Sequence, residues 1–252
     1  MKLVNIVGAR PQFIKLAPLE RAIAEFNSGD TRSVESVIIH TGQHYDSGKT
    51  DIFFDELKIP RAHFHLDVGS GRHGEQTGRM LEKIEHILLD TSPDMVVTYG
   101  DTNSTLAGAL AASKLHIPVA HVEAGLRSFD RHMPEEINRL VADHVSDLLL
   151  APTPTAVTNL GNENLSSRTV FTGDIMYDAV LFNRDLAKQQ SGILKKLRLA
   201  PGTFGLVTVH RASNTDEKGR LGKLLQTFNE VAAKQLPLVF PVHPRTANAL
   251  KS

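Results

Sequence analysis

Residues 95–115, MVVTYGDTNSTLAGALAASKL, join a strand-like segment to a helix-like segment. The first five residues are apolar, β-branched or aromatic, which favours a buried strand, and the Ala- and Leu-rich run from Asn103 predicts a helix. Gly100-Asp101 lies between the two, so a polar turn follows the carboxyl end of the strand. A strand, a turn and a helix in this order form the repeating unit of a parallel α/β sheet.

The same alternation recurs along the chain. Further strands are predicted at residues 3–7, 36–40, 119–122 and 148–151, with a shorter one near Val170, and amphipathic helices at residues 75–89 and 134–145. Short strands alternating with helices are typical of a doubly wound, Rossmann-like parallel sheet with helices on both faces.

Two prolines set the expected starts of helices. Pro18 would break a helix that began at Pro11, so we expect a short turn over residues 11–16 and a main helix that starts at Pro18. Thr153-Pro154 combines an N-cap hydroxyl with a proline at the first helical position, which predicts a helix over the following residues, 155–163.

A turn signal at Pro201-Gly202 indicates a domain boundary, after a polar helical stretch over residues 179–199. The pattern then restarts, with strands at 205–208 and 238–241 and a helix at 218–234. We predict an N-terminal domain over residues 1–173, a connecting segment over 174–202 and a second domain over 203–252. Because two strands leave the apolar faces of their helices uncovered, the second domain is expected to be incomplete.

The composition excludes several classes of partner. The 252 residues carry 28 basic and 28 acidic side chains, mixed along the chain, and no cysteine. This balance gives no basic surface for nucleic acid or a membrane, and the lack of cysteine excludes disulfides and thiolate nucleophiles. No apolar run approaches the ~18 residues of a membrane span. We therefore expect a cytoplasmic protein that binds neither nucleic acid nor membranes.

Polar residues follow most of the predicted strands. Because the carboxyl ends of parallel strands meet at one edge of a sheet, five such segments favour a binding site over a merely solvated rim. The first strand lacks G-x-G-x-x-G, and the chain lacks G-x-x-x-x-G-K-[ST], which disfavours dinucleotide and P-loop phosphate binding. The five segments are Gly8-Ala9-Arg10, His40-Thr41-Gly42-Gln43-His44, Gly100-Asp101-Thr102-Asn103-Ser104, Glu123-Ala124-Gly125-Leu126-Arg127 and His210-Arg211.

The acidic residues in these segments allow two interpretations each. Asp101 could cap the helix that follows it or serve as a site carboxylate. Glu123 lies one residue beyond an apolar strand, where a carboxylate is partly desolvated and suited to proton transfer. Glu135 and Glu136 open a helix, where acids ordinarily complement the helix dipole, although one of them could point into a cleft.

The basic residues also allow more than one interpretation. Arg10 and Lys15 could hold a phosphate or carboxylate, or form a salt bridge at the rim. The histidines near acids show no ligand spacing such as H-E-x-x-H, so a structural role is favoured over a metal site. His210 and Arg211 follow the first strand of the second domain, and His243-Pro244-Arg245 repeats this arrangement after the next strand. Facing the acids, they would suit acid–base chemistry on a phosphorylated substrate.

Seven sequence blocks, in this order, resemble the non-hydrolysing UDP-N-acetylglucosamine 2-epimerase family along nearly the whole chain. The resemblance implies a GT-B architecture of two Rossmann-like domains with the active site between them. It also implies inversion at C2 of a UDP-linked 2-acetamido sugar without NAD or a metal, in a homodimer. The blocks are Gly8-Ala9-Arg10-Pro11, Thr41-Gly42-Gln43-His44, Tyr99-Gly100-Asp101-Thr102, His121 to Arg127, Pro134 to Arg139, Val209-His210-Arg211 and Pro241-Val242-His243-Pro244.

The resemblance implies a role for particular residues and a reaction route. UDP would be eliminated to leave a 2-acetamidoglucal and then be added back, which would supply an N-acetylmannosamine-type precursor for surface polysaccharide. The residues implied are the catalytic Asp101, Glu123, Glu135 and His210, the substrate-binding Arg10, Lys15, Arg127, Arg211 and His243, and a regulatory UDP-sugar site at Gln43, His44 and Glu136.

The sequence departs from the family at its end. The Gly-rich strand–loop–helix segment that holds the uridine diphosphate in the family does not follow, so we expect a C-terminally truncated chain with no turnover and weak or absent UDP binding by itself. The alternatives are a UDP-2,3-diacetamido uronic acid 2-epimerase, a hydrolysing 2-epimerase, a GT-B glycosyltransferase and an inactive binding module, since a fold alone does not decide function.

Overall fold

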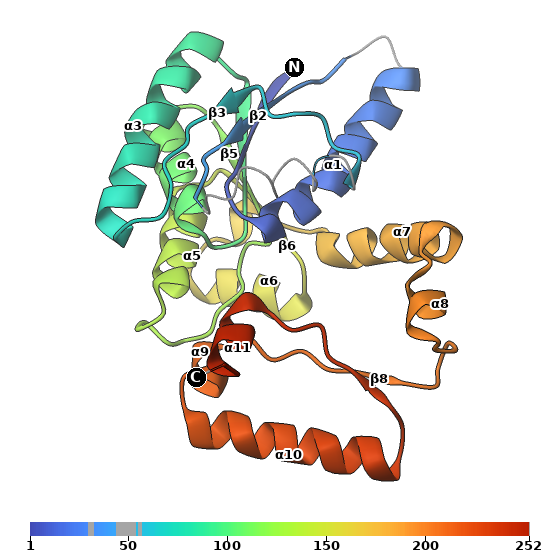
Figure 1. Cartoon of the computed structure of the whole chain (residues 1–252). Coiled ribbons are helices and arrows are strands. Elements are labelled where there is room, and N and C mark those ends of the chain that lie inside the picture. Colours follow the sequence, from blue (N-terminus) through green and yellow to red (C-terminus); the bar gives the residue numbers. More distant parts are fainter. Residues whose placement is uncertain (30–32, 44–53, 55–56, 252) are drawn as a thin grey trace. The chain divides into compact units, whose positions relative to one another are not determined.

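The computed structural model describes residues 1–29, 33–43, 54 and 57–251 (Figure 1). The chain forms two compact units, Met1–Asn183 and Arg184–Ser252, which are described separately below. The division lies within helix α7 (Ile175–Gln190) and therefore inside the segment over residues 174–202 that the sequence predicts to connect two domains.

The first unit is built on a parallel sheet of seven strands in the order β3-β2-β1-β4-β5-β6-β7. The order runs outward in both directions from the centrally placed β1 and β4, which is the doubly wound arrangement. The strands are β1 (Lys2–Val7), β2 (Glu35–His40), β3 (Phe64–His65), β4 (Met95–Tyr99), β5 (Val119–Val122), β6 (Leu148–Ala151) and β7 (Thr169–Phe171).

Helices cover both faces of this sheet. Helices α3, α4 and α5 lie together on one face, and α1 lies on the other (Figure 1). Within the described ranges, the unit contains the helices α1 (Arg10–Gly29), α3 (His73–Thr91), α4 (Asn103–Lys114), α5 (Pro134–Val145) and α6 (Pro154–Asn162), with a 3-10 turn, η1 (Ser166–Arg168), before β7 and the start of α7 after it.

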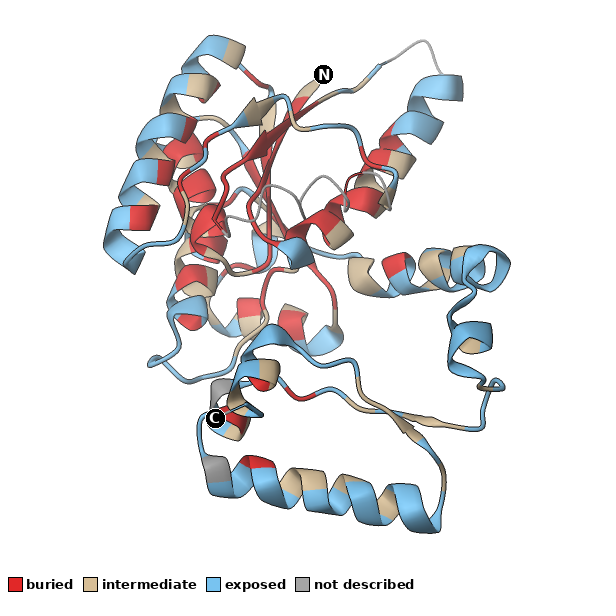
Figure 2. Cartoon of the chain, viewed as in Figure 1, coloured by how far each residue is buried: buried red, intermediate tan, exposed pale blue. Residues whose placement is uncertain are grey.

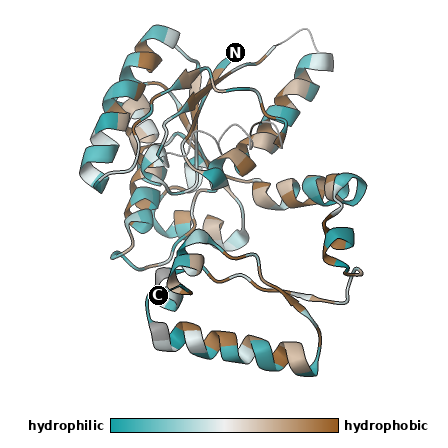
Figure 3. Cartoon of the chain, in the orientation of Figure 1, coloured by the Kyte–Doolittle hydropathy of each residue, from teal (hydrophilic) through white to brown (hydrophobic). Residues whose placement is uncertain are grey.

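Successive strand residues point to opposite faces and fill two separate cores. Ile6 and Val96 pack with Met80 and Ile84 of α3, while Val97 belongs to the core beneath α1. The inner strands β1, β2, β4 and β5 are therefore buried along most of their length and are mainly apolar, as Figures 2 and 3 show. This double burial is the reason that the strands are continuous apolar runs in the sequence rather than alternating ones.

The predicted bounds are confirmed for β4, β5, β6 and α5, and the predicted starts of β1 and β2 differ by one residue from the observed ones. The start of α6 is also confirmed, because Thr153 is the N-cap and its side chain accepts a hydrogen bond from the Ala156 N–H. Pro154 then occupies the first turn. Local capping chemistry determined this helix start.

The prediction for α1 is wrong. The helix is continuous over Arg10–Gly29, with Pro18 inside it, whereas the sequence suggested a break at that proline. Phe13, Leu16 and Ala17, on the two turns before Pro18, are all buried against the sheet. Burial of three apolar side chains offsets the backbone hydrogen bond that the proline cannot donate, which costs about 3 kcal/mol in an isolated helix.

The second unit contains a two-stranded parallel sheet, β8-β9, whose strands are shorter than predicted. The polar helical stretch predicted over residues 179–199 is interrupted at Ser191-Gly192, between α7 and α8. In α10, Leu221 is buried and most other positions are partly or fully exposed (Figure 2). The elements are α8 (Ile193–Leu197), β8 (Gly205–Leu206), α9 (Ala212–Thr215), α10 (Lys218–Lys234), β9 (Leu238–Val239) and α11 (Pro244–Ala249).

Within the part of the chain that the structure describes, no helix combines the length and the apolar composition that crossing a bilayer requires.

Candidate active site

The turns after β4 and β5 leave the sheet at the same level. Tyr99 of β4 is paired with Val122 of β5, so Gly100 and Glu123 are the next residues on neighbouring strands. The Gly100 N–H donates to the Val122 carbonyl at 3.0 Å, which extends the pairing into the turn. The two acids that follow these strands, Asp101 and Glu123, therefore begin from adjacent points of one sheet edge.

Glu123 forms an ion pair with Lys15 of α1, and both side chains are largely buried, with 18% and 9% exposed respectively. Gly100 is packed directly against this pair. A Cβ atom at position 100 would lie 2.9 Å from Lys15 Nζ and 3.3 Å from Glu123 Oε2, and the Gly100 φ of +65° also favours glycine. Glycine at this position makes room for the ion pair.

The backbone of Glu123 adopts a conformation that is uncommon for a residue with a side chain. Its φ is +73°, which costs on the order of 1–3 kcal/mol for a non-glycine residue. The Glu123 and Ala124 N–H groups both donate to the Leu150 carbonyl at 3.1 Å, and these bonds hold the turn. Backbone strain of this kind clusters at functional sites, where it aims a side chain in a fixed direction.

Asp101 is not the cap of α4. Thr102 is the N-cap, and its side chain accepts a hydrogen bond from the Thr105 N–H. The Asp101 carboxylate instead forms an ion pair with Arg139 of α5, and the Asn138 amide donates to the Asp101 carbonyl at 2.9 Å. With 30% of its side chain exposed, Asp101 keeps access to solvent and is the more accessible of the two acids.

Glu136 lies in the first turn of α5, and its carboxylate binds the loop that precedes this helix. It accepts hydrogen bonds at 2.9 Å from the Ser128 N–H, the Ser128 hydroxyl and the Phe129 N–H, and it pairs with Arg139 at 2.8 Å. Burial alone would raise the pKa of this carboxyl, but the hydrogen bonds outweigh burial and lower the pKa of Glu136 to about 2. Its neighbour Glu135 is exposed on the first turn of α5.

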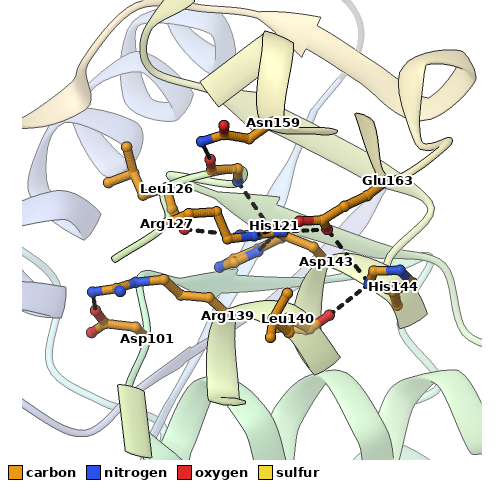
Figure 4. Close-up of polar contacts among 12 residues, drawn as sticks. Asp101, His121, Leu126, Arg127, Arg139, Leu140, Asp143, His144, Asn159 and Glu163 are labelled. Atoms are coloured by element: carbon orange, nitrogen blue, oxygen red, sulfur yellow. Dashed lines mark hydrogen bonds and ion pairs between the residues drawn. The ribbon is translucent and has the colours of Figure 1, made fainter. Parts of the chain in front are cut away.

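A buried charged cluster lies behind the two turns (Figure 4). His121 and Asp143 are fully buried and their side chains are 2.7 Å apart, and Arg127 joins Asp143 to Glu163 with 2.7 Å contacts to each. Burial would raise the pKa of Asp143, but the hydrogen bond from His121 and the charge of Arg127 lower it overall. Only 1% of the Arg127 side chain is exposed, so its guanidinium is committed to this cluster.

The remaining predicted residues of the first unit are placed as follows. Arg10 begins α1 and is exposed at the same edge of the sheet. Gln43 is buried, and its side-chain oxygen accepts from the Ser104 N–H at 3.1 Å and from the Ser104 hydroxyl at 2.7 Å. His44 lies outside the described residues. The Gln43 oxygen is thus already used in linking the turn after β2 to the start of α4.

In the second unit, the predicted basic residues gather in one place. The rings of His210 and His243 are 5.6 Å apart, and both side chains are exposed, as is Arg211. His243 is the N-cap of α11, where its Nδ1 accepts from the Arg245 N–H at 3.2 Å. The hydroxyl of Thr246 donates to the Val209 carbonyl and ties α11 to the residue before His210.

Sequence reasoning missed Arg139 and Asp143 as site residues. Both lie on α5 with Glu136, at spacings of three and seven residues that place all three on one face of the helix. The presence of a base, Arg139, and an acid, Asp143, on the inner face of an amphipathic helix could have indicated a role in the site. The structural role favoured for His121 agrees with its buried, hydrogen-bonded position.

An apolar cavity of about 290 Å³ lies beside Glu123, between the sheet, α1 and α7. Most of its lining is aliphatic, including Leu3, Val97 and Leu150. Such a surface is poorly suited to a diphosphate, because buried anions need donors or cations and the charged side chains in the lining, Glu123, Asp174 and Asp178, are acidic. The polar edge that carries Asp101, Lys15 and Glu123 is the better candidate for binding a charged substrate.

Fold and site together define an α/β protein of the GT-B class, with a Rossmann-like first unit, a smaller α/β second unit, and two acids, Asp101 and Glu123, that follow adjacent strands of the larger sheet. The sequence profile of the family described as UDP-N-acetylglucosamine 2-epimerase matches residues 28–252. The chain belongs to this family of isomerases.

Several known proteins are similar over the full length of the chain. It is 54% identical to a UDP-N-acetylglucosamine 2-epimerase homolog of Methanococcus maripaludis and covers 68% of that protein. It is 46% identical to the UDP-2,3-diacetamido-2,3-dideoxy-D-glucuronate 2-epimerase of Pseudomonas aeruginosa and covers 69% of it. The crystal structure of Methanocaldococcus jannaschii UDP-GlcNAc 2-epimerase in complex with UDP-GlcNAc and UDP matches with a TM-score of 0.84 and 45% identity, and the chain covers 68% of it.

Proposed function

We propose that the protein inverts the configuration at C2 of a UDP-linked 2-acetamido sugar and interconverts UDP-N-acetylglucosamine and UDP-N-acetylmannosamine. The observation that carries the proposal is the pair of acids on adjacent strand ends, Asp101 and Glu123, each beside a basic partner. Inversion at carbon needs proton transfer on both faces of the ring, and therefore at least two acid–base groups. Family membership supports the substrate class.

The proposed reaction is an elimination followed by addition. The C2 hydrogen is not acidic, because C2 carries an acetamido group and has no adjacent carbonyl. One carboxylate takes the C2 proton, the C1–O bond breaks, and UDP leaves with the bonding electrons, which gives a 2-acetamidoglucal. UDP then adds back to C1 while a proton reaches the opposite face of C2. Retention of both fragments makes the return step effectively unimolecular.

Within this mechanism we propose catalytic roles for Asp101, Glu123, Glu135 and His210. Arg10, Lys15, Arg211 and His243 would contact the substrate, with His210 and Arg211 stabilising the leaving diphosphate. The regulatory site predicted at Gln43, His44 and Glu136 stays a prediction. The internal contacts of Glu136 and of Arg127 favour supporting roles for these two residues, which hold the 126–129 turn.

A second candidate substrate is a UDP-linked 2,3-diacetamido uronic acid. It is favoured by the 46% identity to the Pseudomonas aeruginosa enzyme, which equals the identity to the UDP-N-acetylglucosamine 2-epimerase of Methanocaldococcus jannaschii. The acid–base chemistry at C2 would be the same for both sugars. The difference lies at C3 and C6, so the two substrates have to be compared directly.

We also propose a cytoplasmic homodimer that supplies an N-acetylmannosamine-type precursor for surface polysaccharide. The support is the family membership of the chain. Light scattering after size-exclusion chromatography tests the dimer through the molar mass.

Exchange of the C2 hydrogen tests the proposed function. The protein expressed from its complete reading frame is incubated with each UDP-sugar in heavy water and followed by NMR. We expect deuterium at C2 and a second UDP-linked epimer, because the proton is exchanged with solvent during elimination. Free sugar together with UDP would indicate a hydrolysing enzyme. No exchange with either substrate would contradict the proposal, and transfer to an added acceptor without exchange would indicate a glycosyltransferase.

A further inference from the structure

The ring of His121 connects the turn that carries Asp101 to the interior of the unit. Its Nε2 lies 2.7 Å from the Gly100 carbonyl oxygen, and its Nδ1 lies 2.7 Å from Asp143 Oδ1. His121 and Asp143 are both fully inaccessible to solvent. A buried imidazole with two short contacts has a fixed orientation, so it can hold a neighbouring peptide group in place.

Both nitrogens of this ring act as donors. A carbonyl oxygen only accepts, so Nε2 carries a hydrogen toward Gly100. Asp143 Oδ2 already accepts from the Gly125 N–H at 3.1 Å and from Arg127 at 2.7 Å, which marks Asp143 as an ionised carboxylate. Its other oxygen therefore accepts from Nδ1. His121, Asp143, Arg127 and Glu163 are thus connected in this order by contacts of 2.7 Å.

These contacts fix the turns that carry both acids. The Gly100 carbonyl is held by His121 and the Gly100 N–H by the Val122 carbonyl at 3.0 Å, so the peptide groups on both sides of Gly100 are set. Gly100 is followed by Asp101 and lies against the Glu123 carboxylate. Asp143 also holds the Gly125 N–H, two residues after Glu123.

We propose that His121, supported by Asp143, is a positioning residue that holds the Gly100–Asp101 peptide and thereby sets the Asp101 carboxylate relative to Glu123. This role rests on the proposed function, since it concerns the geometry of its two acids. It predicts that the contact to Gly100 acts on turnover directly and that the contact to Asp143 acts on turnover through the orientation of the ring. Displacement of a catalytic group by about 1 Å can lower a rate on the order of 100-fold.

Two substitutions of similar size separate these contacts. In His121→Gln the amide nitrogen can take the place of Nε2 and donate to Gly100, whereas in His121→Asn it takes the place of Nδ1 and reaches only Asp143. We expect His121→Asn to lower kcat by about 100-fold and His121→Gln by less than about tenfold, because only the latter keeps the peptide in place. KM should change little in either variant, because no contact with substrate is removed.

The experiment measures kcat, KM and thermal unfolding on the protein from its complete reading frame. Tyr99→Phe serves as a buried control, because it removes only the hydroxyl that donates to Asn5 Oδ1 at 2.6 Å; it should lower the melting temperature without changing kcat. Should His121→Asn not fold, Asp143→Asn keeps the shape of the cluster but loses its charge. This variant should lower kcat at least about tenfold at unchanged KM, because the ring is then less firmly held.

Equal kcat values for His121→Asn and His121→Gln would overturn the proposal, as would a wild-type kcat in Asp143→Asn. The wild-type protein provides the separate test of function. If it exchanges the C2 hydrogen and the variants do not differ, the positioning role fails and the proposed function stands. If the wild-type protein shows no exchange, the proposed function itself fails.

Discussion

At the scale of single residues, the site depends on small and unusual backbone positions as much as on its charged groups. Gly100 and Glu123 both have positive φ angles and lie next to each other at the sheet edge. The absence of a side chain at Gly100 leaves space for the Lys15 ammonium group. Glu123 has a strained backbone conformation, in which its side chain pairs with Lys15. The consequence is a carboxylate with a fixed cationic partner close to the turn of Asp101.

Gly100→Ala tests whether the site needs a glycine at this position, both for the positive φ angle and for the space occupied by the end of Lys15. The left-handed backbone conformation would cost an alanine at this position about 1–2 kcal/mol of folding free energy. Its methyl group would also displace the flexible end of Lys15 from Glu123. We expect a loss of stability of that size and a loss of at least tenfold in kcat. Urea unfolding and steady-state kinetics measure the two effects.

Gly173→Ala is the matched control for this substitution. Gly173 also has a positive φ, of +80°, but no atom lies within 4 Å of the position its Cβ would take. Its stability should fall by a similar amount of about 1–2 kcal/mol while kcat stays unchanged. If both variants lose activity equally, backbone strain alone explains the effect, and the displacement of Lys15 is irrelevant.

At the scale of elements, the sequence predicted the bounds of a strand or helix correctly where these depend on one strong local signal. The apolar runs of β4 and β5 and the Pro134 start of α5 allowed their bounds to be predicted. The two-residue β3 was not predicted, because a pair of residues carries no periodicity. Helix α1 was mispredicted because burial against the sheet, a tertiary effect, outweighs the local preference of Pro18.

Replacement of prolines in two helices tests this explanation. Pro18→Ala restores an N–H that can donate within α1, so we expect the free energy of unfolding to rise by about 1 kcal/mol after the gain in unfolded-chain entropy is subtracted. Pro154→Ala in the first turn of α6 restores no intrahelical bond and loses a preset φ, so it should lower stability by about 0.5 kcal/mol. Equilibrium urea unfolding measures both. A loss of stability in Pro18→Ala would show that the helix is built around the proline.

At the scale of the whole molecule, the convergence of strand ends was the most useful prediction. It follows from topology, because parallel strands present all their carboxyl ends at one edge. Asp101, Glu123 and Lys15 do come together in the first unit, and His210 and His243 in the second. The partner of Asp101 was not predictable, since Arg139 comes from a helix face that only folding brings to this edge. The same holds for Asp143, which lies on that helix face and contacts His121.

Kinetic coupling tests whether both units serve the same turnover, as the proposed roles of Glu123 and His210 require. Glu123→Gln and His210→Asn should each lower kcat by about 100-fold or more, which is the usual loss for an acid–base group. Groups that act as one unit show strongly non-additive losses, so the double variant should be about as slow as the slower single variant. Steady-state rates of C2 exchange provide the measurement, and thermal unfolding of each variant controls for folding. Losses that multiply would mean that the two residues act independently, and His210 would then have no place in the proton transfers at C2.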